Sequence, residues 1–244
     1  MITNIDYERE IYHNMLDRLV NEYNFAKFVV HSCYADDFRY EWNECDKAAD
    51  EIGFWVSSGA TRVVFGLDRD SEIVIKIQLD TDTVDYSKRE AEVYAEAKEE
   101  GLEEFFAESV PLFKYHFEDG GMSKDITIYA MERIECGYDD ISDDSYNYHY
   151  AEFCREHDLD PADDESRDAY YDDRNYDEAD EEGMVVYAVS TWGGKWGDYA
   201  ELFKFMREHY INDMHAGNWG YRGGKLVMCD YGGFGHLECR RMHY

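Results

Sequence analysis

Apolar and polar residues alternate in blocks that predict two helices at the start of the chain. Residues 5–30 place apolar side chains three or four positions apart, as at Ile11, Met15 and Leu19, which predicts an amphipathic helix. Residues 35–53 predict a second helix that ends at Gly53. We expect both helices to pack on the strands that follow them.

The middle of the chain has the alternation that is typical of β-strands. Residues 54–78 predict three strands, because apolar positions alternate on either side of two short polar turns. Residues 84–101 have a helical composition that ends at a glycine, and residues 111–117 and 125–135 predict two more strands. With a further helix at 196–210, this order predicts an α+β fold.

Near the carboxyl end, three polar residues stand at fixed intervals around a short apolar strand. Asp213 is followed five residues later by Asn218, and the apolar segment 225–229 leads into Asp230. An Asp can orient a nucleophilic hydroxyl, whereas Asn218 and Asp230 offer the hard oxygen ligands that Mg²⁺ prefers. Phosphotransferases use the same residue types at this spacing. The pattern therefore predicts phosphoryl transfer from ATP, with Asn218 and Asp230 as metal ligands.

Residues 213–218 and 230–232 together resemble the catalytic loop and the Asp-Phe-Gly segment of the protein-kinase-like superfamily. The first fits the Asp-x-His-x-Gly-Asn form found in aminoglycoside and choline kinases and in atypical kinases, and the second reads Asp-Tyr-Gly. Ile211 and Asn212 stand in place of the His and Arg of ordinary protein kinases, which favours the small-molecule or atypical branch. The chain is also similar in style to small atypical kinase-like proteins of bacteria and their phages.

The resemblance implies a two-lobed fold with an antiparallel five-stranded small lobe and a minimal, truncated helical large lobe. It divides the chain into a helical extension (1–53), a small lobe (54–136) and a large lobe (137–244) that carries an acidic insertion (138–183). We expect the large lobe to be minimal because 14 residues follow Asp230, which leaves no room for an activation segment or a substrate platform.

A lone lysine, Lys76, lies within the apolar run 73–77. A charge in an apolar strand is costly unless it is paired, so one interpretation is an edge strand whose Lys reaches water. The other is the lysine that holds the ATP phosphates, because the run resembles the Val-Ala-Ile-Lys strand of kinases. The motif downstream favours the second interpretation. The resemblance then makes Glu90 on the next helix the expected partner, with Glu92 as a competitor on another face.

The first predicted hairpin would cover the nucleotide phosphates in a kinase, but its tip keeps a single glycine, Gly59. Arg62 stands where a third glycine is expected. Ser57, Ser58 and Arg62 could contact phosphate through their side chains instead. The alternative is a hairpin that simply turns the chain.

The resemblance assigns roles to four further residues. The segment from Met131 to Arg133 falls where the hinge would contact adenine through its backbone. Asp213 would position or deprotonate the acceptor hydroxyl. His215 would orient the loop or stabilise developing charge, with a purely structural role as the alternative.

The formal net charge of −32 is unevenly distributed. Residues 138–183 hold 19 acidic residues against three arginines, a local charge of −16, and interleave the acids with tyrosines. One interpretation is a solvated insertion with short helices such as 145–159. The other is a docking surface for a basic partner or a mimic of nucleic-acid charge. A salt-adapted host would also explain the acidity. We expect no direct binding to DNA or RNA, because phosphate contacts need Lys and Arg.

The remaining composition predicts a cytoplasmic protein with one two-lobed core. A chain of 244 residues with 44% hydrophobic content can bury such a core. The six cysteines are scattered, and neither a leader peptide nor a membrane span is recognisable. His236, Cys239 and His243 could suggest a metal site, but no second Cys or His pair completes a tetrahedral set.

Two hypotheses about function remain open. The first is an ATP- and Mg²⁺-dependent phosphotransferase with an unidentified hydroxyl acceptor. The second is a non-catalytic pseudokinase whose acidic surface binds or inhibits a basic partner, such as a nucleic-acid-binding protein. Retention of the five polar residues favours the enzyme: Lys76, Glu90, Asp213, Asn218 and Asp230. The short carboxyl end and the degenerate glycine loop favour the interaction protein.

Overall fold

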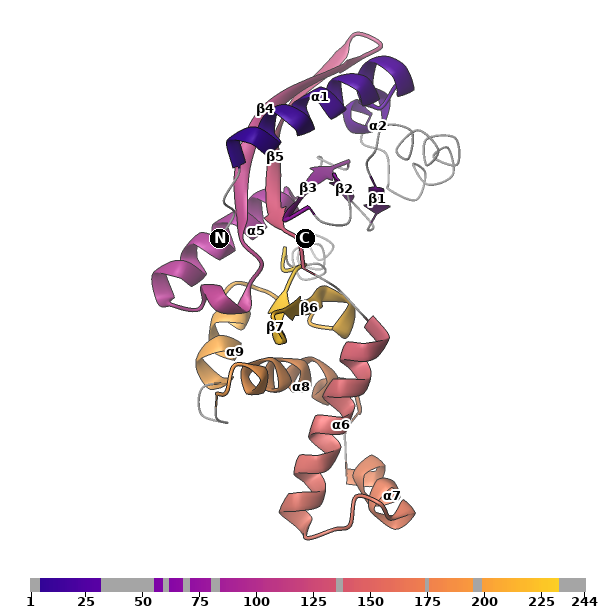
Figure 1. Cartoon of the computed structure of the whole chain (residues 1–244), viewed down its shortest axis with the longest axis vertical. Coiled ribbons are helices and arrows are strands. Elements are labelled where there is room, and N and C mark those ends of the chain that lie inside the picture. The colour runs from indigo at the N-terminus through magenta and orange to yellow at the C-terminus, as the bar shows by residue number, and fades with distance from the viewer. Residues whose placement is uncertain are drawn as a thin grey trace, which may run out of the picture. The chain divides into compact units, whose positions relative to one another are not determined.

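The computed structural model describes residues 5–31, 55–58, 62–67, 71–79, 84–134, 138–173, 176–194 and 199–232. These residues form an α+β fold with a five-stranded antiparallel sheet and a separate two-stranded sheet (Figure 1). They divide into two compact units. The first unit takes residues up to 96 together with 107–133, and the second takes 97–106 together with residues from 134 onward. The helix predicted over 35–53 lies outside the described residues.

Two helices, α1 (Ile5–Tyr23) and α2 (Ala26–Val30), replace the single helix predicted at the start of the chain. The break lies at Asn24, which adopts a left-handed conformation with φ of 55°. Asn tolerates this conformation better than most residues because its short polar side chain can form local hydrogen bonds. The chain direction therefore changes there, and the apolar faces of both helices remain buried.

The five predicted strands are confirmed, with β4 longer than expected and β5 three residues earlier in the chain than expected. The strands are β1 (Trp55–Ser58), β2 (Arg62–Gly66), β3 (Ile73–Gln78), β4 (Ser109–Asp119) and β5 (Met122–Glu132). Their order is β1-β2-β3-β5-β4, and every neighbouring pair is antiparallel. Gly120 and Gly121 join β4 to β5 with φ values of 59° and 84°, which suit the tight turn of a hairpin.

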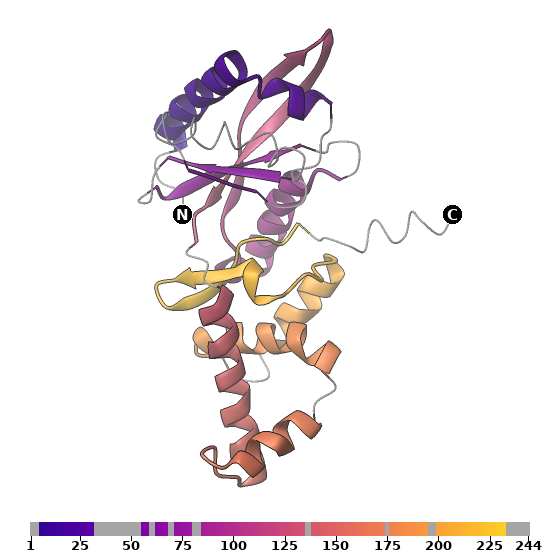
Figure 2. The same ribbon diagram turned by 90° about the vertical axis from the view of Figure 1, so that its right-hand side faces the viewer.

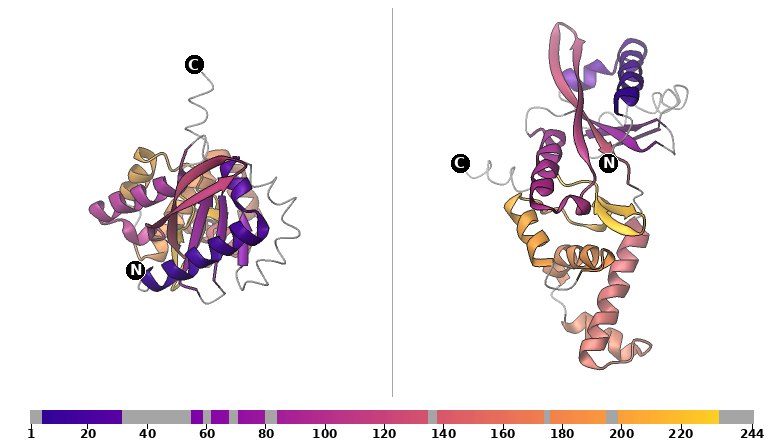
Figure 3. Two further views of the ribbon diagram at one scale, coloured as in Figure 1. Left: turned by 90° about the horizontal axis from the view of Figure 1, so that it is seen from above. Right: turned by 60° about the vertical axis from the view of Figure 1, so that its left-hand side comes forward.

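One face of the sheet forms the core of the first unit with α1 and α2 (Figure 3). Every second side chain along a strand, such as Val63 on β2 and Ile75 on β3, points into this core. The hydroxyl of Tyr12 on α1 donates a hydrogen bond of 3.0 Å to the carbonyl oxygen of Ile73 on β3. The expectation that the first helical segment covers the sheet is therefore confirmed for residues 5–30.

Helix α5 (Tyr86–Glu100) confirms the helix predicted over 84–101. Asp85 caps its start, because its Oδ1 accepts a hydrogen bond of 2.9 Å from the backbone N–H of Lys88. Gly101 ends it with φ of 75°, and the N–H of Leu102 donates to the carbonyl of Ala97 at 2.8 Å. This is the glycine-terminated end that the sequence predicts. The buried stripe of the helix is Tyr86, Glu90, Val93 and Ala97.

The described residues of the second unit from 138 onward form α-helices and the small sheet (Figure 2). Its elements are α6 (Tyr138–His157), α7 (Asp164–Asp173), α8 (Tyr176–Thr191), α9 (Tyr199–Glu208), β6 (Trp219–Arg222) and β7 (Lys225–Met228). Helix α9 confirms the helix predicted over 196–210. Helix α8 was not predicted, although its second half contains buried apolar residues such as Val185 and Val189.

The acidic segment 138–183 is not the solvated insertion that one interpretation predicted. Ile141 on α6 is fully buried, and Asp144 accepts a hydrogen bond of 2.8 Å from the hydroxyl of Tyr221 on β6. The His149 ring is 2.8 Å from the carbonyl oxygen of Gly183 on α8. Both ends of the segment therefore belong to the packing of the second unit.

The middle of the acidic segment packs around aromatic side chains of its own. Tyr150, Cys154 and Tyr170 are buried together between α6 and α7. The rings of Tyr146 and Tyr150 stack with centroids 6.0 Å apart. The tyrosines that alternate with the acids thus form a small core, while the carboxylates lie outside it.

Across the described ranges, no helix is both long and apolar enough for a bilayer span.

Candidate functional site

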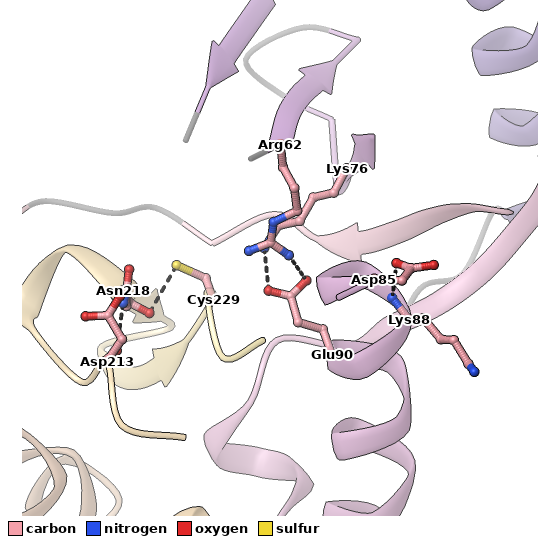
Figure 4. Close-up of polar contacts among 8 residues, drawn as sticks. All are labelled: Arg62, Lys76, Asp85, Lys88, Glu90, Asp213, Asn218 and Cys229. Atoms are coloured by element: carbon pink, nitrogen blue, oxygen red, sulfur yellow. Dashed lines mark hydrogen bonds and ion pairs between the residues drawn. The ribbon is translucent and has the colours of Figure 1, made fainter. Parts of the chain in front are cut away.

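Three charged side chains of the first unit, Arg62, Lys76 and Glu90, lie in contact on one face of the sheet. We call them the Glu90 cluster. The Lys76 ammonium lies 3.0 Å from Oε1 of Glu90, and the Arg62 guanidinium lies 2.8 Å from Oε2 (Figure 4). All three side chains are at most 8% exposed. One buried carboxylate therefore holds two cations, one at each oxygen.

The alternation of the strands places the Glu90 cluster on the face opposite the α1 core. Val63 and Ile75 point toward α1 and α2, so their neighbours Arg62 and Lys76 point the other way. Glu90 reaches the cations from the buried stripe of α5. The sequence thus builds the cluster from strand alternation and helix periodicity.

The pairing predicted between Lys76 and Glu90 is confirmed, and the edge-strand interpretation of Lys76 is wrong. Strand β3 lies between β2 and β5 in the sheet, and Lys76 is 7% exposed. Glu92, the competitor, points to solvent and pairs instead with Lys88 at 3.4 Å. The two glutamates lie on different faces of α5, as the helical period requires.

The predicted phosphate contact of Arg62 stays a prediction, and the structure shows the side chain engaged with α5. Its guanidinium binds Glu90 and lies 5.9 Å from the ring centre of Tyr86. No sequence signal pointed to this pair. Ser57 and Ser58 lie on β1, and their backbones pair with β2. Their side chains are not described, and Gly59 lies outside the described residues.

The predicted hinge segment lies at the end of strand β5, which ends at Glu132. Met131 is buried within the sheet at 2% exposure. The N–H of Glu132 donates to the carbonyl of Glu108 at 2.8 Å, and the N–H of Arg133 donates to that of Glu72 at 2.9 Å. These two backbone donors are engaged within the protein, and the adenine contact of this segment stays a prediction.

In the second unit, the predicted catalytic and metal residues lie in residues 211–232, which we call the loop–hairpin block. Tyr210 has φ of 55° and turns the chain out of α9, and the N–H of Ile211 donates to the carbonyl of Met206 at 2.8 Å. Ile211 and Met214 are buried anchors. Between these anchors, Asp213 keeps 42% of its side chain exposed.

His215 stabilises the loop through both ring nitrogens. Its Nδ1 accepts a hydrogen bond of 3.1 Å from the N–H of Gly217, at the start of the 3₁₀ turn Ala216–Asn218. Its Nε2 lies 3.3 Å from Oδ1 of Asp213. Because Nδ1 is an acceptor, a neutral ring carries its proton on Nε2 and donates it to Asp213. His215 can therefore orient the Asp213 carboxylate.

Asn218 connects the loop to the end of β7. Its Nδ2 donates to the carbonyl of Asp213 at 2.7 Å. Its own carbonyl accepts from the N–H of Cys229 at 2.8 Å and from that of Asp230 at 3.4 Å. The Cys229 thiol also donates to this carbonyl at 3.3 Å (Figure 4). The structure thus brings Asp213, Asn218 and Asp230 together, as the spacing predicted.

The residue after Asp230 fixes the end of this strand. Tyr231 is 1% exposed, and its ring packs against Phe106 with centroids 5.1 Å apart. Phe106 in turn packs against Phe205 on α9. The backbone at Asp230 is therefore held on one side by Asn218 and on the other by a buried aromatic side chain.

The donor set of the loop–hairpin block fits a hard cation such as Mg²⁺. The hydrogen bond from Nδ2 fixes the amide of Asn218, which leaves Oδ1 as the oxygen for a metal. Asp230 supplies a carboxylate, and Mg²⁺ completes its shell with waters and phosphate oxygens. No group of three or more His, Cys, Asp or Glu side chains suited to a metal occurs among the described residues. His236, Cys239 and His243 lie outside them.

Comparison of the chain with protein-family models and with curated proteins finds no match.

Proposed function

We propose that the chain is a kinase-like phosphotransferase that binds ATP with Mg²⁺ and moves the γ-phosphoryl group to a hydroxyl acceptor. The observation that carries this proposal is the buried ion pair between Lys76 on β3 and Glu90 on α5. In protein kinases, a Lys on the third strand and a Glu on the following helix form this pair, and the Lys binds the ATP phosphates. Stability is a weak explanation for such a pair, because apolar residues often replace buried ion pairs without loss.

The loop–hairpin block supports the proposal with residues of suitable chemistry. Asp213 is exposed enough to accept a proton from an acceptor hydroxyl, and His215 and the loop backbone orient it. Asn218 and Asp230 offer the oxygens that hold Mg²⁺, which neutralises charge on the phosphates when bound. We place this activity in the cytoplasm, where the thiols of Cys154 and Cys229 would remain reduced.

Binding of Mg-ATP is the first test. A ligand at 100 times its dissociation constant stabilises the folded state by about 2.7 kcal/mol, so thermal melts should shift upward with ATP only when Mg²⁺ is present. Lys76→Met in the first unit and Asp230→Asn in the second should both weaken this binding. Lys88→Met is the matched control, because Lys88 is an exposed lysine of the same unit. A folded sample that shows no Mg²⁺-dependent shift at millimolar ATP would exclude the proposal.

Phosphoryl transfer is the second test. Asp213→Asn should retain Mg-ATP binding and lose transfer, since positioning and charge stabilisation supply most of the rate. The assay follows radiolabelled γ-phosphate, including its hydrolysis and its transfer to the chain itself. Equal background in wild type and Asp213→Asn, with both still binding Mg-ATP, would refute the catalytic role.

That outcome would favour the alternative, a non-catalytic protein that binds a basic partner. The observation that supports it is the α6–α7 region, where carboxylates surround a core of tyrosines. A Lys- and Arg-rich partner suits this charge, and its binding should weaken as salt screens the attraction. Direct binding of nucleic acid does not suit it.

A further inference from the structure

Arg62 is the feature of the first unit that the proposed function does not use. It approaches Oε2 of Glu90 at 2.8 Å while Lys76 approaches Oε1 at 3.0 Å (Figure 4). The Glu90 side chain is 1% exposed, so water does not take the place of either cation. Each carboxylate oxygen therefore has its own cationic partner.

The register of the sheet explains how two strands reach one carboxylate. Arg62 on β2 pairs with Gln78 on β3, and Lys76 lies two residues before Gln78. Arg62 and Lys76 are thus diagonal neighbours on one face of the sheet. Arg62 also lies over the ring of Tyr86, which is one helical turn before Glu90 on α5. Arg62 therefore contacts α5 at two successive turns.

This double contact restricts the rotation of the Glu90 carboxylate. A carboxylate held at one oxygen by a flexible lysine can still turn, whereas a planar guanidinium fixes the second oxygen. Lys76 has three N–H donors, and its bond to Glu90 uses one of them. A fixed Glu90 therefore also fixes where the other donors of Lys76 point.

We propose that Arg62 is a positioning residue, which holds Glu90 so that Lys76 is directed at the phosphates of the nucleotide. This inference rests on the proposed function, in which Lys76 binds phosphate. It assigns Arg62 a role that acts through its ion pair with Glu90 and not through direct phosphate contact. The effect of Arg62 on nucleotide binding then passes through Glu90 and Lys76.

A double-mutant cycle on Mg-ADP affinity, measured by calorimetry, distinguishes positioning from direct contact. Arg62→Gln should weaken binding about tenfold in the wild-type background and less than about twofold in the Lys76→Met background, because coupled residues are not additive. A direct phosphate ligand would give the same loss in both backgrounds, and that result would overturn the inference. Lys88→Gln should leave affinity unchanged, since Lys88 pairs with the exposed Glu92.

A second measurement needs no nucleotide. An amine-specific acetylating reagent, read by mass spectrometry on the folded protein, should modify Lys76 slowly in wild type and at least about fivefold faster in Arg62→Gln, because its partner Glu90 becomes mobile. Lys88, whose side chain is 59% exposed, is the internal control and should react equally in both. Arg62→Lys keeps the charge but loses the planar guanidinium, so it should give an acetylation rate between those of wild type and Arg62→Gln, and it replaces Arg62→Gln if that variant does not fold.

The two measurements separate the two proposals. If wild type does not bind Mg-ADP, the proposed function fails, while the acetylation rate of Lys76 still decides whether Arg62 positions the pair. If wild type binds Mg-ADP but Arg62→Gln leaves both affinity and acetylation unchanged, the proposed function stands and the positioning role is wrong.

Discussion

Replacing Glu90 with Gln should destabilise the first unit more than any other single charge change in the described part of the chain. Gln keeps nearly the same shape and loses the negative charge. Two cations, Arg62 at 2.8 Å and Lys76 at 3.0 Å, would then share a buried site with a neutral amide. The effect comes from this uncompensated charge, because the packing volume changes little.

The magnitude follows from the burial of the pair. Removing one partner of a buried ion pair costs about 3–5 kcal/mol, out of a total stability of about 5–15 kcal/mol for a typical domain. In a chain of this size, each kcal/mol lowers the melting temperature by about 2–4 °C. We therefore expect Glu90→Gln to lower the melting temperature of the first unit by roughly 6–20 °C.

Urea and thermal melts followed by circular dichroism measure this change. The matched control is Glu92→Gln on the same helix, where the exposed pair with Lys88 at 3.4 Å contributes only about 0.3–0.5 kcal/mol. If Glu90→Gln destabilises the protein no more than Glu92→Gln, the Glu90 cluster does not hold the buried charges described above.

Three further predictions address other parts of the chain. Burial raises the pKa of Tyr12 to about 12, so above pH 10 the unfolded chain releases a proton that the folded chain retains; stability should fall by about 1.4 kcal/mol per pH unit between pH 10 and 12. Tyr12→Phe should remove this part of the slope, and an unchanged slope in urea melts would refute the assignment. Asp85→Ala should cost about 1 kcal/mol by removing the cap of α5, and no loss in melts would show that the cap contributes nothing. Ile141→Ala should cost about 2–5 kcal/mol, whereas Tyr171→Ala, at an exposed site, should cost far less; equal losses would contradict the placement of α6 in the core.

The Glu90 cluster shows which parts of a site can be predicted from sequence. The lone Lys76 in an apolar strand and the resemblance that singled out Glu90 identified the ion pair, and the helical period separated Glu90 from Glu92, because these signals are local in the sequence. Arg62 was missed as a partner because its contact depends on the register between β2 and β3. Register arises from tertiary packing, and the sequence of one strand does not specify it.

Two other features could not be predicted, for different physical reasons. In α6, a few apolar positions such as Ile141 lie among many acids, so the average composition concealed a buried face. The sequence pattern predicted a strand over 125–135, whereas β5 spans Met122–Glu132, and strand ends are the least certain feature of a sequence pattern. The backbone N–H groups of Glu132 and Arg133 find their partners at Glu108 and Glu72, which lie in other segments of the chain and are brought there by tertiary packing.

The hydrogen bonds of Asn218 also have a consequence for the order in which the protein folds. The bond to Asp213 spans five residues, and the bond from the Cys229 thiol to the Asn218 carbonyl spans 11. Short loops of this kind close at a small entropic cost, and contacts between residues close in sequence form rapidly. We therefore expect the loop–hairpin block to assemble early. The pairing of β3 with β5 and the packing of α1 on the sheet join residues far apart in the sequence, such as the 98 positions between Tyr115 and Asp17, and should follow later.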